Sequence, residues 1–175
     1  LLDVELDGDI DVVVAAGDAA ELLIVRNETL SQFGRNFCGI GAPNSTGLLG
    51  GLEAYGGAEV FLQELELTAT QLPSNVTGLF LASRQPDLRF DVPGSEGILC
   101  LGGEIGRFVG PGQIQNSGPE GHFQLDLDLT AMPRPMGTAS VMPDQTWYLQ
   151  AWHRDVDSAG QPTSNFTDAL ELAFR

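Results

Sequence analysis

The chain has 175 residues, of which 24 are acidic and 8 are basic, and its formal net charge is −16. This charge argues against nucleic acid as a partner, because phosphate binding relies on basic patches. The 22 glycines, 10 prolines and 42% hydrophobic residues predict one main turn-rich globular domain rather than a disordered chain, and no apolar run is long enough to span a bilayer.

The acidic stretch at residues 3–11 has the spacing of a calcium loop. Oxygen side chains fall at its first, third, fifth and ninth positions, Gly8 stands at the sixth, and the Asp9 carbonyl is available at the seventh. Calcium takes roughly six to eight oxygen ligands from a flexible loop, and a glycine permits the sharp turn. Val14 replaces the last glutamate of an EF-hand, so a different calcium loop is expected. The predicted Ca²⁺ ligands are Asp3, Glu5, Asp7, Asp9 and Asp11.

The residues after this loop predict a β-hairpin. Two runs rich in β-branched and aliphatic residues, 10–16 and 21–27, are separated by a Gly17-Asp18 turn. Loop and hairpin together resemble an FG-GAP or VCBS repeat, in which the loop binds calcium and each repeat is one blade of a β-propeller. The resemblance covers residues 1–29. We interpret residues 1–29 as one unit and residues 30–175 as a second domain.

A single blade leaves strand edges unpaired, whereas a propeller closes from several blades. The hairpin could pack on the following domain, pair with another copy of the chain, or belong with blades in a removed part of a precursor. The chain begins without a methionine or a signal peptide, and we interpret it as a processed piece of a longer secreted protein.

The two cysteines, Cys38 and Cys100, are expected to form a disulfide. An even cysteine count in an exported product favours a bridge, which would stabilise the fold by about 4 kcal/mol. The alternative is two unpaired buried thiols.

The second domain has the pattern of an antiparallel, jelly-roll-like β-sandwich. Apolar and polar residues alternate over 62–68 and 123–129, which is typical of strands with one wet face. Glycine, proline and asparagine turns separate the short strands, and convincing helical periods are missing. The expected strands are 59–70, 77–83, 97–101, 122–129, 146–154 and 169–174.

Residues 30–175 also resemble a C-terminal domain of large secreted and surface proteins of planctomycetes and myxobacteria. The motifs that carry this resemblance are Cys38 with 43–47, 72–73 with 78–80, 99–103 with 106–108, 146–155, and 164–169. The resemblance implies a secreted, β-rich accessory domain at the cell surface or outside the cell.

Catalytic signals are weak. Nucleophilic catalysis needs a base beside the nucleophile, and the two histidines, His122 and His153, accompany no Gly-x-Ser-x-Gly elbow. The two cysteines cannot form a zinc site alone, because no further cysteine or paired histidine has ligand spacing. We expect a protein that is not an enzyme, with a structural or surface role for His153.

Three aromatic residues in 146–154 are candidates for ligand stacking. In a strand, Tyr148 and Trp152 share one face and Trp147 lies on the other, so at least one group must be core. Tyr148 and Trp152 could stack on a sugar, and core packing is the alternative. The segment 155–160, with Asp168, is a second cation candidate, for which an acidic turn is the simpler interpretation.

Four asparagines stand in Asn-x-Ser/Thr sequons and could carry glycans. They are Asn27, Asn44, Asn75 and Asn165. Four sequons are more than chance would give, and the preference of asparagine and serine for turns explains part of this excess.

These patterns lead to one functional expectation and one alternative. The first is a non-catalytic extracellular structural module that Ca²⁺ stabilises and that self-associates by strand pairing, into a homo-oligomer or filament or with other surface proteins. The alternative is a carbohydrate-binding accessory domain that takes a polysaccharide.

Overall fold

The structure is a computed structural model that describes residues 12–16, 21–25, 32–39 and 41–175. In these residues the fold is all-β, apart from one short 3-10 helix, η1 (Val60–Leu62). The predicted hairpin is present as β1 (Val12–Ala16) and β2 (Glu21–Val25), which pair antiparallel from Val12↔Val25 to Ala16↔Glu21. Within the described strands they pair only with each other. That the hairpin is a propeller blade stays a prediction.

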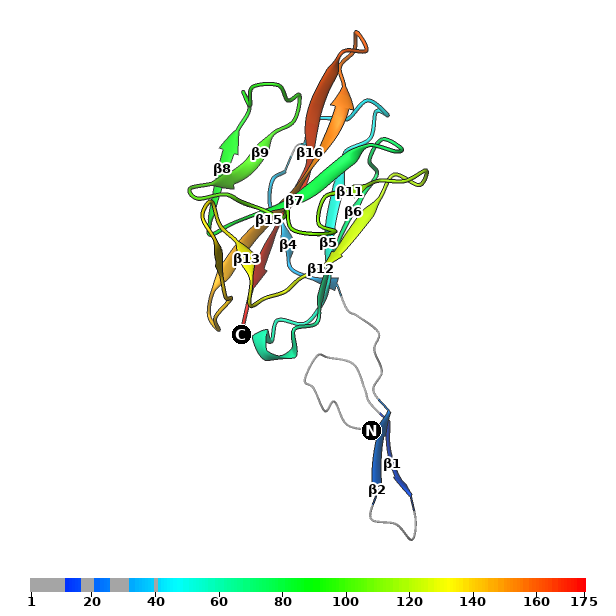
Figure 1. The fold of residues 1–175 in the computed structure, drawn as a ribbon, viewed down its shortest axis with the longest axis vertical. Helices are drawn as coiled ribbons and strands as arrows, with labels where there is room; N and C mark the ends of the chain where they lie inside the picture. Colours follow the sequence, from blue (N-terminus) through cyan, green and yellow to red (C-terminus); the bar gives the residue numbers. More distant parts are fainter. Residues whose placement is uncertain (1–11, 17–20, 26–31, 40) are drawn as a thin grey trace.

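The first of two main sheets has the order β10-β7-β15-β16-β4, with β11 also on β7. Of these strands, β4, β7, β11, β15 and β16 are labelled in Figure 1. The centre of this sheet is a long hairpin formed by β15, with eleven residues, and β16, with twelve residues. A register shift between Gln150 and Trp152 interrupts this hairpin. The strands are β4 (Arg35–Asn36), β7 (Thr77–Ser83), β10 (Gly106–Arg107), β11 (Gln115–Asn116), β15 (Thr146–Val156) and β16 (Pro162–Ala173).

The second sheet has the order β12-β6-β5-β3 and is antiparallel throughout. Its strands are β3 (Gln32–Phe33), β5 (Gly51–Gly56), β6 (Leu65–Thr70) and β12 (Phe123–Asp126). Along β6 the alternation expected from the sequence is confirmed, because Leu65 and Leu67 are buried while Glu66 and Thr68 are partly exposed.

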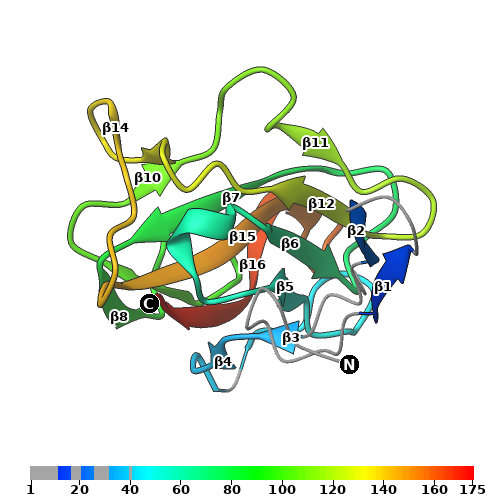
Figure 2. The same ribbon diagram turned by 90° about the horizontal axis from the view of Figure 1, so that it is seen from below.

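The main core lies between these two sheets. Leu52 and Leu67 from the four-stranded sheet belong to one buried cluster with Phe80, Leu149 and Leu170 from the six-stranded sheet. The predicted antiparallel sandwich is therefore confirmed, and Figure 2 shows the β5–β6 pair beside the β7–β15–β16 strands.

A third layer covers part of the other face of the six-stranded sheet. It is formed by β8 (Gln85–Arg89) and β9 (Leu99–Gly102), which pair with each other. Leu99 and Leu101 from β9 pack with Leu81 of β7 and Phe166 of β16 in a smaller second cluster. In addition, β13 (Met132–Pro133) and β14 (Thr138–Ala139) form a short antiparallel pair.

Most predicted strands match observed strands, with one clear error. The segment 59–70 is not one strand, because η1 occupies its start and Gln63 turns the chain with a φ of 58°. Gly56, with a φ of 135°, packs against the Glu64 carbonyl where a side chain would collide. Two observed strands were not predicted: β5, which has a glycine at each end, and the first half of β16, whose polar residues pair with β15.

The predicted disulfide between Cys38 and Cys100 is confirmed, with the two Cα atoms 5.7 Å apart. Cys38 follows β4, an edge strand of the six-stranded sheet, and Cys100 lies in β9. The bridge therefore ties the outer layer to the edge of the sandwich.

Removing this bridge is expected to destabilise the domain substantially. It closes a loop of sequence separation 62, and such a crosslink stabilises by about 4 kcal/mol in the chain-entropy account. The double variant Cys38→Ala/Cys100→Ala should lose about this much free energy of unfolding in urea titrations. An unchanged urea midpoint in the double variant would contradict this role.

Candidate functional site

The main candidate site is a groove on the outer face of the six-stranded sheet, which we call the outer groove. Its floor comes from β7, β15 and β16, and its sides come from the 92–93 loop, β9 and the 105–109 segment. Its volume is about 470 Å³, within the range of roughly 300–1,000 Å³ typical of small-molecule sites. The floor residues are Leu79, Leu81, Trp152 and Phe166, and the sides include Val92, Leu99, Ile105, Arg107 and Val109.

Strand alternation in β15 determines which aromatic side chains face this groove. Trp147 is buried in the main core, whereas Tyr148 and Trp152 pack against the outer cluster. The prediction that Tyr148 and Trp152 share one face, opposite Trp147, is confirmed.

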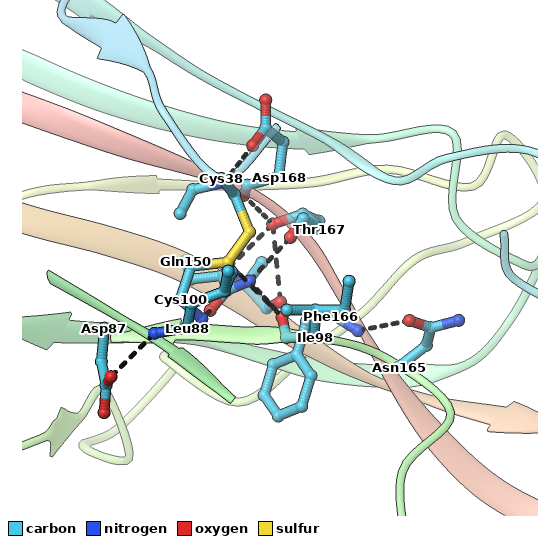
Figure 3. The surroundings of a disulfide bond; sticks show 12 residues. Cys38, Asp87, Leu88, Ile98, Cys100, Gln150, Asn165, Phe166, Thr167 and Asp168 are labelled. Atoms are coloured by element: carbon cyan, nitrogen blue, oxygen red, sulfur yellow. Dashed lines mark hydrogen bonds between the residues drawn. A yellow bond between two sulfur atoms is a disulfide. The ribbon is translucent and has the colours of Figure 1, made fainter. Parts of the chain in front are cut away.

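The two aromatic rings do not form a continuous platform. Gln150, between them on the same face, accepts a hydrogen bond from the Cys100 N–H at 2.9 Å and donates to the Ile98 carbonyl at 2.9 Å (Figure 3). The main chain at β9 is thus held over the sheet between the positions of Tyr148 and Trp152. Tyr148 packs edge-on against Phe37 with ring centroids 5.3 Å apart, and only Trp152 of the pair lines the groove.

Positive charge lies at the groove. Arg107 is an exposed lining residue, and the Arg154 guanidinium carbon lies 5.3 Å from the centroid of the Trp152 ring. Four other arginines pair with carboxylates, but within the described part of the chain neither Arg107 nor Arg154 does. Two further lining side chains have polar groups: Ser164, whose hydroxyl donates to the Gly94 carbonyl at 2.9 Å, and Trp152, whose indole N–H is a donor.

The sandwich has a polar cluster at one end, beneath the 43–47 loop. Asp155 accepts the Ser45 N–H at 3.1 Å and the Asn165 amide at 3.4 Å, so its carboxylate serves as a structural acceptor. Asp157 accepts the N–H groups of Ala159 and Gln161, each at 2.8 Å. The segment 155–160 therefore has the hydrogen bonds of an acidic turn, and no metal-binding cluster of His, Cys, Asp or Glu occurs among the described residues.

His153 is fully buried in β15. Its Nδ1 lies 3.0 Å from the Arg154 carbonyl, so Nδ1 carries the proton and donates, and Nε2 has no partner in the described structure. Burial holds the pKa of His153 below its ordinary value, while the Arg154 carbonyl and the charge of Asp155 oppose the shift. No hydroxyl or thiol among the described residues hydrogen bonds to this ring, which therefore has the surroundings of a structural group.

Two of the sequon asparagines are structural hydrogen-bonding residues. The Asn44 amide donates to the Gln71 carbonyl at 2.7 Å, and the buried Asn165 amide donates to the Pro43 carbonyl at 3.2 Å. A glycan on either nitrogen would disturb these bonds, whereas Asn75 is exposed. Asn27 and the predicted calcium ligands Asp3, Glu5, Asp7, Asp9 and Asp11 lie outside the described residues.

Sequence reasoning missed most of the outer groove. Arg107 and Val109 stand in a glycine-rich segment with no periodic pattern, and Phe166 was part of a motif noted only for its resemblance. The one sequence pattern that pointed to the groove was the alternation along β15, which placed Trp152 on the face opposite Trp147. Pairing of β10 with β7 brings the 105–109 segment to the same face.

His153 should make the domain less stable in acid. The folded pKa is depressed, so below about pH 6.5 the unfolded chain binds the proton first and stability falls until the folded pKa is reached. We expect His153→Gln to remove a slope of up to about 1.4 kcal/mol per pH unit from urea unfolding between pH 7.5 and 5. The matched control is His122→Gln at an exposed histidine. A slope lost in the control and retained in His153→Gln would refute this assignment.

No family model, curated protein or solved structure matches this chain. The resemblances to FG-GAP or VCBS repeats and to a secreted surface domain therefore stay predictions.

Proposed function

We propose that this chain is a non-catalytic extracellular binding module that holds a small, largely apolar ligand in the outer groove. The observation that carries the proposal is a groove of about 470 Å³ with a floor of leucine, tryptophan and phenylalanine side chains. Concave, mainly apolar sites with a few polar groups are the usual form of small-molecule sites.

The chemistry of the polar residues supports binding rather than catalysis. His153 gives its Nδ1 proton to a main-chain carbonyl, Asp155 accepts main-chain and amide donors, and both cysteines are in the disulfide. The disulfide also supports an oxidising, extracellular setting. In the described residues no helix is long and apolar enough to cross a membrane.

An uncharged apolar dye can test the groove without assuming a natural ligand. Phenylnaphthylamine should bind the intact protein saturably at one site, with a rise in fluorescence. Val109 lies in the side of the groove and is 55% exposed. The larger side chain of Val109→Trp should fill part of the groove and weaken dye binding by about tenfold or more. Val156→Trp places the same residue at a 44% exposed position outside the groove lining and should leave binding unchanged. The proposal fails if the dye does not saturate, or if both variants bind it as the parent does.

A second proposal concerns self-association through the hairpin. Within the described strands β1 and β2 pair only with each other, so each has an edge that could add to a strand of another copy. The predicted calcium loop ends at Asp11, directly before β1. Calcium bound there would hold the start of the hairpin and favour pairing between copies.

Calcium should therefore change both stability and size. At a concentration about a hundred times the dissociation constant it would stabilise the folded chain by about 2.7 kcal/mol. We expect chelator to lower the melting temperature and to shift light scattering toward monomer. Asp7→Ala should abolish both calcium effects, while Asp18→Ala, outside the predicted ligand set, should retain them. Melting and size that do not respond to calcium would refute the proposal.

A further inference from the structure

We propose that the ligand of the outer groove is an amphipathic carboxylate with a hydrocarbon body, of the fatty-acid class. This inference rests on the proposed binding function and specifies its ligand. The groove combines an apolar floor with a positive charge, and both features differ from the acidic character of the chain as a whole.

The charge contrast is the first argument. The chain has 24 acidic and 8 basic residues, but no carboxylate side chain lines the groove. Arg107 lines it, and Arg154 lies over the Trp152 ring that forms part of its floor. Because both arginines lack a carboxylate partner in the described structure, a ligand carboxylate would supply the missing counter-charge.

Hydrogen-bonding capacity is the second argument. The Ser164 hydroxyl proton is already donated to the Gly94 carbonyl, so the remaining side-chain donors of the lining are Arg107 and the indole N–H of Trp152, and of these only Arg107 is charged. One guanidinium matches one carboxylate, because its planar fork can donate two parallel N–H groups to the two oxygens. A saccharide presents many hydroxyls, and these lining side chains satisfy few of them.

The shape of the floor is the third argument. Leu79, Leu81 and Phe166 provide aliphatic and aromatic surface for a hydrocarbon body. The Arg154 guanidinium lies over one face of the Trp152 ring, so that face is not free for a stacked sugar. The geometry therefore favours a hydrocarbon chain over the polysaccharide considered from sequence.

The test compares probes with the same hydrocarbon chain and different head groups. Isothermal titration of the intact protein with decanoate, decanol and decyltrimethylammonium, all below their aggregation concentrations, should give decanoate the highest affinity. A soluble oligosaccharide serves as the fourth probe and should not bind in the groove.

Two pairs of variants assign the preference to the groove. Arg107→Gln should weaken decanoate binding by about three- to tenfold and leave decanol unchanged. Arg84→Gln is the control, since Arg84 also lacks a carboxylate partner in the described residues but lies over Trp147, away from the groove lining. Val109→Glu should weaken decanoate more than its neutral match Val109→Gln does.

The outcomes separate this inference from the proposed function. Decanoate preferred over decanol, with the preference lost in Arg107→Gln and kept in Arg84→Gln, supports the inference. Equal binding of decanol and decanoate at the groove overturns the carboxylate assignment and leaves the binding function standing. Oligosaccharide binding that depends on Trp152 also overturns the carboxylate assignment. Failure of all probes, including the uncharged dye, overturns both.

Discussion

The arrangement of the outer face depends on the fully buried amide of Gln150. It bonds to the Cys100 N–H and the Ile98 carbonyl on the β9 side, and donates to the Thr167 carbonyl of β16 at 2.8 Å. Each buried main-chain group left unpaired would cost about 1–3 kcal/mol. One side chain from the centre of the sheet therefore fixes where the third layer lies, and the Cys38–Cys100 disulfide secures the same strand covalently.

The position of β9 divides the outer face into two regions with different surroundings. On one side Tyr148 packs against Phe37 and contributes to the fold. On the other side Trp152 and Phe166 line the groove, which β9 bounds with Leu99. Because β10 pairs with β7, the chain after β9 returns to this face and places Arg107 at the groove. The site is thus a consequence of how the outer layer is attached.

The sequence was sufficient to predict those features that depend on local patterns. Alternation over 62–68 and 123–129 predicted the sandwich, alternation along β15 predicted the separation of Trp147 from Trp152, and the cysteine count predicted the disulfide. It was not sufficient where pairing over long distances decides the structure. The polar start of β16 is a strand because β15 pairs with it, and β5 is a strand despite glycines at both ends. Asn165 stands in a sequon, but its side-chain amide donates a hydrogen bond to the Pro43 carbonyl at one end of the sandwich. The groove residues come from six separate segments of the chain, and these segments share no common sequence pattern.

The proposed binding requires that the outer groove itself, and not another apolar surface, receives the hydrocarbon body of a ligand. Intermolecular nuclear Overhauser effects between decanoate and methyl-labelled protein test this most directly. We expect contacts from the ligand chain to the methyl groups of Leu79, Leu81 and Val92, with the carboxylate end near Arg107. Contacts confined to exposed leucines elsewhere, such as Leu48 and Leu49, would contradict it.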